Sequence, residues 1–210
     1  MAKIGIMGGT FDPIHNAHLM LGGQAWKEYS LDEVWFMPSH TPPHKTDHQI
    51  TDTNDRCEMV KLAIAEYPYF RFSDFEISRT GNTYTAQTLQ LLKEAYPEHT
   101  FYFIVGEDSL YHIETWYHPE LVLGHVTILA AGRECDDAAC SLEKQVDYLK
   151  NKYRAAIFLL HSAAMHISSQ ELRERQSHGT GIHDLVPDSV ERYIREHGLY
   201  QHPDRRKDTL

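Results

Sequence analysis

Residues 3–18 read KIGIMGGTFDPIHNAH and contain, in order, an apolar run, two glycines and the start of a helical pattern. The run Ile4–Met7 is apolar at successive positions, which is typical of a strand covered by helices on both faces. Gly8 and Gly9 predict a tight turn after this strand, where the backbone can come close to a bulky ligand. The stretch therefore predicts the strand, turn and helix that open an α/β fold.

The same turn carries groups that bind phosphate. Thr10 adds a hydroxyl group, and the N-terminus of the following helix presents unpaired N–H groups, which attract anions. His15 and His18 are three positions apart, so both side chains project to one side and can reach the same phosphate chain. The alternatives are a plain tight turn with two surface histidines, or a zinc site, for which no further ligands stand nearby at compatible spacing.

Short β-type runs alternate with helical patterns along the rest of the chain, which predicts a parallel sheet. We expect a doubly wound, Rossmann-like α/β fold with helices on both faces and ligands at the carboxyl ends of the strands. Strands are expected at 3–7, 34–38, 70–76, 101–105, 126–130 and 156–160, and helices at about 17–29, 54–66, 85–95, 138–151, 168–175 and 188–197.

Three details refine this expectation. The continuous apolar runs Phe101–Val105 and Ile157–Leu160 favour central strands, like the run that opens the chain. Thr85 is expected to cap the third helix, and Gly198 to end the last one. We expect residues 1–200 to form a single domain, residues 201–210 to form a flexible tail, and the polar stretch Ser39–Asp55 to be a loop or lid.

Composition excludes several classes of protein. The chain has 210 residues, a formal net charge of −10 and 3 cysteines without CxxC spacing, which disfavour a nucleic-acid partner, a disulfide framework and a zinc knuckle. No secretory signal and no apolar stretch of membrane-spanning length is present, so we expect a soluble, cytoplasmic protein without a membrane partner. The 15 histidines are scattered, which favours surface positions over the alternative of metal storage or sensing.

The segment GGTFDPIHNAHL, at residues 8–19, resembles the HxGH signature of the nucleotidyltransferase superfamily in its nicotinate-nucleotide adenylyltransferase form, with Ala17 between the histidines in place of glycine. The last matching segment, Ile167–Arg173, resembles the family motif ISSTxIR, with Gln170 and Leu172 as departures. Further segments that resemble the family, in the same order, are Pro42–Lys45, Arg79–Thr85, Gly106–Ser109 and Trp116–Tyr117. The resemblance covers the chain from Gly8 to about Tyr200.

The resemblance implies a site residue by residue. Its catalytic residues would be His15, His18, Lys45 and Arg173. Its ATP-binding residues would be Gly8, Gly9, Thr10, Phe11, His15, His18, Gly106, Asp108, Ser168 and Arg173. Its nicotinate mononucleotide-binding residues would be Arg79, Thr83, Tyr84, Thr85, Asp108 and Trp116. The helix start at Thr83–Thr85 would offer amides to the carboxylate of nicotinate.

Several of these residues also have ordinary explanations. Lys45 can be a solvated lysine, Ser168 a helix N-cap and Trp116 a packing residue of the core. Asp108 can be a turn residue after its strand. These alternatives stay open from the sequence alone.

The resemblance implies that the chain transfers the adenylyl group of ATP to nicotinate mononucleotide, giving deamido-NAD and pyrophosphate. Mg²⁺ would accompany ATP, held mainly by phosphate oxygens and water rather than by a dedicated protein metal site. The alternatives are an adenylyltransferase for nicotinamide mononucleotide or phosphopantetheine, and a nucleotide-binding regulator without turnover. The expected partners are these small molecules, and a homo-oligomer is compatible with the sequence.

Overall fold

A computed structural model describes residues 1–40, 50–79, 81, 83–131, 137–161 and 167–201, with the side chains of 137–141 excepted. The predictions made for Lys45, for residues 41–49 of the polar loop and for residues 202–210 of the tail lie outside the described residues. None of the described helices is both long and apolar enough to cross a membrane.

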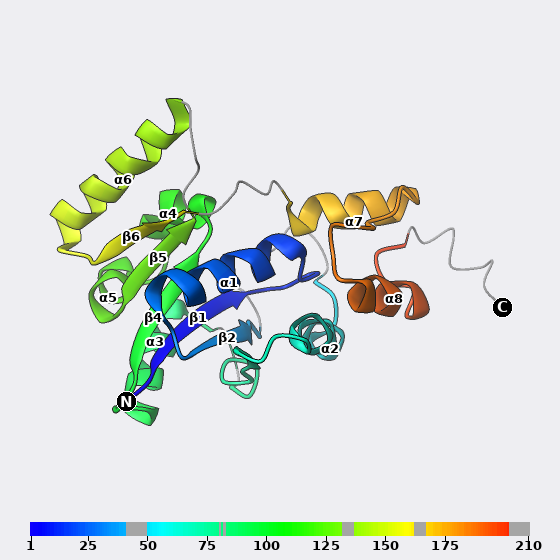
Figure 1. Ribbon diagram of the computed structural model, residues 1–210, viewed down its shortest axis with the longest axis horizontal. Coiled ribbons are helices and arrows are strands. Elements are labelled where there is room, and N and C mark those ends of the chain that lie inside the picture. The colour runs from blue at the N-terminus through cyan, green and yellow to red at the C-terminus, as the bar shows by residue number, and fades with distance from the viewer. Residues whose placement is uncertain (41–49, 80, 82, 132–136, 162–166, 202–210) are drawn as a thin grey trace.

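The described strands form one six-stranded parallel sheet in the order β3-β2-β1-β4-β5-β6 (Figure 1). The apolar runs predicted these strands because each is short and flanked by helical patterns. Their bounds are β1 Lys3–Gly9, β2 Glu33–Pro38, β3 Phe70–Phe72, β4 Thr100–Val105, β5 Thr127–Ala131 and β6 Ile157–Leu160.

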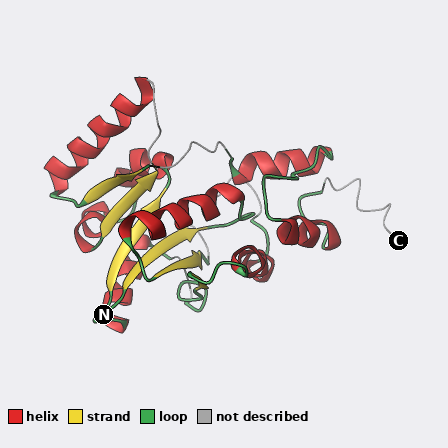
Figure 2. Ribbon diagram, in the orientation of Figure 1, coloured by secondary structure: helices red, strands yellow, loops and turns green. Residues whose placement is uncertain are grey.

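Helices cover both faces of the sheet, as Figure 2 shows, and this confirms the predicted doubly wound fold. Their side chains form two buried clusters, one with α1, α2, α7 and α8 and the other with α3, α4, α5 and α6. The bounds are α1 Asn16–Tyr29, α2 Thr53–Ile64, α3 Thr85–Ala95, α4 Glu107–His112, the 3₁₀ helix η1 Ile113–Thr115, α5 Pro119–His125, α6 Asp137–Tyr153, α7 Ser169–His178 and α8 Asp188–Glu196.

The strand order reverses between β1 and β4, which lie side by side in register with Met7 opposite Ile104. Helix α1 follows β1 and packs on the face of Met7, whereas α4 follows β4 and packs on the face of Phe103. The two helices thus pack on opposite faces of the sheet and begin at the carboxyl ends of these neighbouring strands, which is the place where ligands bind in open α/β sheets.

The structure corrects three predictions about elements. Ile157–Leu160 is an edge strand, and Phe158 is 46% exposed there. The prediction was wrong because apolar runs do not distinguish an edge strand from a central one. The third strand ends at Phe72, and the chain then turns so that Glu76 becomes buried. Thr85 is the first residue of α3, whose N-cap is Tyr84.

Three short elements were not predicted from the sequence: α4, η1 and α5. Each is too short to show a helical period. Pro119 at the first position of α5 is nevertheless a recognised start signal. The end of the last helix was predicted correctly, since Gly198 follows its C-cap with a φ of 57°.

Candidate active site

The turn between β1 and α1, residues 10–15, is tightly packed. Phe11 is 2% exposed and has a φ of 51°, an uncommon conformation for a residue with a side chain, and one that the surrounding structure must hold. Its ring lies against Phe36 and meets the edge of the His18 ring at a centroid distance of 5.1 Å. A Cβ atom on Gly9 would lie 3.2 Å from the Phe11 ring, so this glycine permits the close packing.

His15 and His18 come together at the start of α1, as their spacing predicted. His15 is the N-cap residue, and the two imidazole rings stack at a centroid distance of 3.7 Å. The backbone N–H of His15 donates to Nδ1 of His18 at 3.3 Å. Because Nδ1 accepts this bond, the neutral ring of His18 carries its proton on Nε2, where it is a hydrogen-bond donor.

His15 differs from His18 in its surroundings. It is 5% exposed, and its Nδ1 atom makes no hydrogen bond of standard geometry to the described residues. Burial lowers the pKa of His15 from 6.5 to about 4. At neutral pH the side chain is therefore uncharged and offers a hydrogen bond rather than a positive charge.

Helix α7 begins against the same turn, although it is far away in sequence. Arg173 donates from Nη1 to the carbonyl oxygen of Asp12 at 2.7 Å, across a separation of 161 residues. Ser169 donates from Oγ to the carbonyl oxygen of Pro13 at 2.9 Å. Ser168 caps the helix by accepting from the backbone N–H of Glu171, which confirms the N-cap alternative for this residue.

The carboxyl end of β4 lies next to the end of β1 and carries Gly106 and Asp108. Gly106 is the N-cap residue of α4, and Asp108 is an exposed residue in the first turn of that helix. The φ of Gly106 is −73°, and a Cβ atom placed there would meet nothing within 4 Å. Neither the backbone conformation nor packing within the protein therefore requires glycine at position 106. The space next to this residue is open.

A second group of predicted residues lies at the start of α3 and after η1. Tyr84 packs its ring on that of Tyr117 at a centroid distance of 4.3 Å. Trp116 is half-buried and meets the ring of Phe103 edge-on at 6.2 Å. Thr83 is 6% exposed. Trp116 is thus a packing residue of the core with part of its surface accessible, as both of its sequence interpretations require.

A buried polar chain supports the segment before α3. Arg79 donates from Nη1 to Oγ1 of Thr88 at 3.1 Å, and Thr88 donates to Oε1 of Glu76 at 2.7 Å. Burial raises the pKa of Glu76, and the contacts with Thr88 and Arg79 oppose this rise. The Nη1 group of Arg79 therefore fixes the segment before α3 to that helix.

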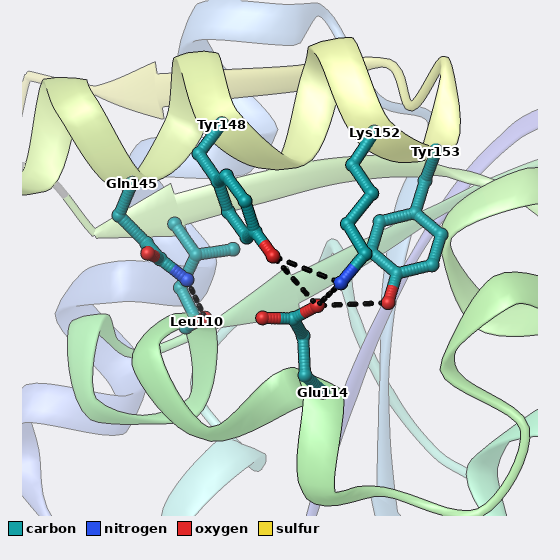
Figure 3. A network of polar contacts seen from close by, with 6 residues as sticks. All are labelled: Leu110, Glu114, Gln145, Tyr148, Lys152 and Tyr153. Carbon is teal, nitrogen blue, oxygen red and sulfur yellow. Dashed lines mark hydrogen bonds and ion pairs between the residues drawn. The ribbon is translucent and has the colours of Figure 1, made fainter.

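A polar network anchors η1, the helix that immediately precedes Trp116 (Figure 3). Glu114 accepts from Lys152 Nζ at 2.6 Å and from the Tyr153 hydroxyl at 2.8 Å, both on α6. These two hydrogen bonds lower the pKa of Glu114. The network ties η1 to α6 and thereby restrains the chain at Trp116.

The predicted residues thus form two groups joined through the sheet. A Cβ atom on Gly8 would lie 3.3 Å from the Phe103 ring, and Phe103 in turn touches Trp116. The first group gathers at the turn after β1, and the second at the ends of β4, η1 and α3. The first group contains Gly8, Gly9, Thr10, Phe11, His15, His18, Ser168 and Arg173, and the second contains Arg79, Thr83, Tyr84, Thr85, Gly106, Asp108 and Trp116.

Sequence reasoning missed three residues that hold the turn: Asp12 and Arg56, which are buried, and Tyr200, which is half-buried. Asp12 was quoted within the motif but given no role, although a buried aspartate always needs partners. Arg56 stands inside an ordinary helical pattern, and Tyr200 at the end of the predicted domain. Their importance depends on contacts between distant segments, which no local pattern shows.

Among the described residues, one group of His, Cys, Asp and Glu side chains could hold a metal ion: His183, Asp188 and Glu191. It contains a single histidine and lies at the start of α8, with His183 and Asp188 exposed. His15 and His18 do not belong to it.

Comparison with known proteins agrees with the geometry. A family model described as cytidylyltransferase-like matches residues 6–175. A protein of Lachnoclostridium phytofermentans is 44% identical over 200 residues, covering 95% of this chain and 100% of the relative. One of Dehalococcoides mccartyi is 42% identical, covering 94% of this chain and 97% of the relative. Both relatives carry the name probable nicotinate-nucleotide adenylyltransferase.

The chain belongs to the nicotinate-nucleotide adenylyltransferase family. Solved structures support the same fold for the family. The nicotinic acid mononucleotide adenylyltransferase of Plasmodium falciparum complexed with APC matches with a TM-score of 0.74 and 23% identity, over 95% of this chain and 98% of that one. The same enzyme complexed with NaAD matches with a TM-score of 0.75 and 24% identity over the same shares.

Proposed function

We propose that this chain transfers the adenylyl group of ATP to nicotinate mononucleotide, with deamido-NAD and pyrophosphate as products. The observation that carries the proposal is the convergence of His15, His18 and Arg173 on one turn at the reversal point of the sheet. The turn occurs in a chain that shares 44% identity with a relative named for this activity.

The reaction needs positioning and charge stabilisation more than a protein nucleophile. The 5′-phosphate oxygen of the mononucleotide attacks the α-phosphorus of ATP in line, and the bond to the bridging oxygen of pyrophosphate breaks. A phosphate is already ionised at neutral pH, so no general base is required. The protein therefore contributes by aligning the two phosphates and by donating hydrogen bonds to oxygens that gain charge.

We assign the donors from their geometry. His18 would donate from Nε2 to the α-phosphate oxygens, because its Nδ1 accepts from the backbone of His15. His15, buried and uncharged, would bond to the adjoining phosphate. Arg173 bonds Asp12 through Nη1, and its remaining donors, together with Lys45, would hold the outgoing pyrophosphate.

The second group would bind the mononucleotide. The amides at the start of α3, at Tyr84 and Thr85, would receive the carboxylate of nicotinate, which favours the acid over the amide. Trp116 would stack on the pyridine ring, with Arg79 and Thr83 beside it. Asp108 would bind ribose, and the open space at Gly106 would admit the nucleotide.

Mg²⁺ would arrive with ATP as part of the substrate. The acidic side chain within the turn, Asp12, already accepts from the Tyr200 hydroxyl and the Thr51 backbone. This arrangement agrees with an ion held by phosphate oxygens and water rather than by a protein cage.

We also propose a cytoplasmic enzyme in which residues 1–200 act as one domain, in a monomer or a homo-oligomer. A nucleic-acid partner is not expected, because the net charge of −10 opposes binding to a polyanion.

The test incubates the purified chain with ATP, Mg²⁺ and nicotinate mononucleotide and measures deamido-NAD and pyrophosphate by chromatography. Equal amounts of both products are expected, with none when the mononucleotide is omitted. A competition between equal concentrations of nicotinate and nicotinamide mononucleotides then measures the ratio of kcat/KM values. Absence of both dinucleotide products would refute the proposal. A higher kcat/KM for nicotinamide mononucleotide would show that the amide, and not the acid, is the substrate.

A further inference from the structure

Arg56, on α2, is 1% exposed and is, with Asp12, one of the two most deeply buried charged residues of the described part of the chain. Burial lowers the pKa of its guanidinium, and the nearby carboxylate of Asp12 opposes this effect. A guanidinium has five N–H donors in a rigid planar fork. The structure gives it five hydrogen bonds, with Nε to Thr51 O at 3.1 Å, Nη1 to Thr10 O at 2.7 Å and Ser39 O at 3.0 Å, and Nη2 to His40 O at 3.3 Å and Thr53 Oγ1 at 3.0 Å.

These acceptors belong to three separate segments. Thr10 lies in the turn after β1, Ser39 and His40 follow β2, and Thr51 and Thr53 open α2. One planar group therefore sets the distance between the ends of two neighbouring parallel strands at the ligand edge of the sheet. Buried ion pairs and buried charges add little net stability. Fixing the relative positions of the three segments therefore explains this buried arginine better than a gain in stability does.

The turn is also held through the side chain of Asp12, one of its own residues, and through Tyr200. The carboxylate of Asp12 is 1% exposed, accepts from the Tyr200 hydroxyl at 2.7 Å and accepts from the Thr51 N–H at 3.4 Å. Thr51 thus bonds Asp12 through its N–H and Arg56 through its carbonyl oxygen. Arg56, Asp12 and Tyr200 form one continuous network around the turn, which we name the turn bracket.

We propose that Arg56 is a positioning residue for adenylyl transfer, which acts by fixing the turn that carries His15 and His18, with Tyr200 as its secondary support. The inference rests on the proposed function, because it assigns a purpose to the same turn. Arg56 does not itself reach the substrate, since all its donors are bonded within the protein.

The test compares Arg56→Lys, which keeps the charge but loses the planar fork, with the surface control Arg71→Lys. Arg71 bonds Glu33 at an exposed position away from the turn. In folded Arg56→Lys, kcat is expected to fall about tenfold to a hundredfold, the cost of misplaced reacting groups. Circular dichroism and unchanged binding stoichiometry for a non-hydrolysable ATP analogue establish that the variant is folded.

Tyr200→Phe keeps the test decisive if Arg56→Lys fails to fold, because it removes only one hydroxyl group. Its matched control is Tyr193→Phe, whose hydroxyl bonds Asp55 at 2.9 Å outside the turn bracket. Tyr200→Phe is expected to lower kcat about fivefold, roughly the value of one hydrogen bond. Tyr193→Phe is expected to stay within about twofold of the parent enzyme, because a partly exposed bond is worth less.

A double-mutant cycle separates positioning from general destabilisation. If Arg56 acts through the turn, Arg56→Lys costs much less in a His18→Ala background than in the parent enzyme. An equal cost in both backgrounds, or a kcat and analogue affinity within about twofold of the parent, would overturn the inference. If the parent binds the analogue but makes no deamido-NAD, the proposed function fails. The analogue affinity of Arg56→Lys then decides whether Arg56 positions the turn: a weakened affinity supports this role, and an affinity within about twofold of the parent overturns it.

Discussion

The turn after β1 and the segment before α3 differ in how they are held. In the turn, the carbonyl oxygens of Thr10, Asp12 and Pro13 each accept from a side chain of α2 or α7. In the segment before α3, the described support is the buried chain from Arg79 through Thr88 to Glu76, and the neighbouring Tyr117 is 45% exposed.

This difference separates two tasks of the proposed reaction. The transferred phosphates must be placed accurately, and a turn braced from several elements places them without reorganisation. Recognition of the pyridine ring can rely on side chains nearer the surface, which adjust when the ligand binds. Changes in the turn should therefore affect kcat, and changes near α3 should affect the KM of the mononucleotide.

The largest effect is expected for His18→Ala, which removes a donor from the reacting phosphate. We expect kcat to fall about a hundredfold to a thousandfold, as for other lost transition-state donors, with the fold retained because His18 is only half-buried. Steady-state kinetics with both substrates saturating provide the measurement. Near-normal turnover would show that His18 does not contact the reacting phosphate. It would also contradict the assignment of kcat effects to the turn and KM effects to the segment before α3.

A second effect concerns stability at low pH and arises from the burial of His15. As the pH falls below 6.5, His15 becomes protonated in the unfolded chain, whereas in the folded chain it stays neutral until about pH 4. The free energy of unfolding therefore decreases over this range. The loss from this group between about pH 7.5 and about pH 5 amounts to about 2 kcal/mol.

Urea unfolding at both pH values measures this effect, with His15→Asn as the comparison because asparagine is also a good N-cap residue. The variant should lose the His15 contribution and show a correspondingly smaller pH dependence. The same pH dependence in both proteins would show that His15 is protonated normally in the folded turn.

The smallest effect is expected for Tyr117→Ala, which removes the ring that supports Tyr84 near the start of α3. The KM for nicotinate mononucleotide should rise about threefold, because an exposed aromatic pair contributes little energy. The KM for ATP and the melting temperature should stay near the parent values. An equal rise in both KM values would show that the two regions are not separate.

Much of the fold could be predicted from the sequence because strands and helices alternate with clear periods. The strand, turn and helix at residues 3–18 were predicted within a few residues, since glycines and apolar runs act locally. The edge position of Ile157–Leu160 was missed, because strand order depends on packing between distant segments.

In the candidate site, too, features that depend on local spacing could be predicted, and contacts between distant segments could not. The stacking of His15 and His18 follows from their helical spacing, which is a local property. The contact of Arg173 with Asp12 agrees with the family resemblance, whereas the fivefold bonding of Arg56 had no local signal. A buried arginine in an amphipathic helix has the same sequence appearance as a solvated one.

The bond between Tyr200 and Asp12 spans 188 residues, almost the whole described chain. Closing so long a loop has an entropic cost, so we expect this contact to form after the local elements during folding. On the ribosome, the first strand and its turn emerge long before their last support. The turn therefore reaches the geometry described above only after Tyr200 has been made, and a chain that stops short of that residue lacks this support.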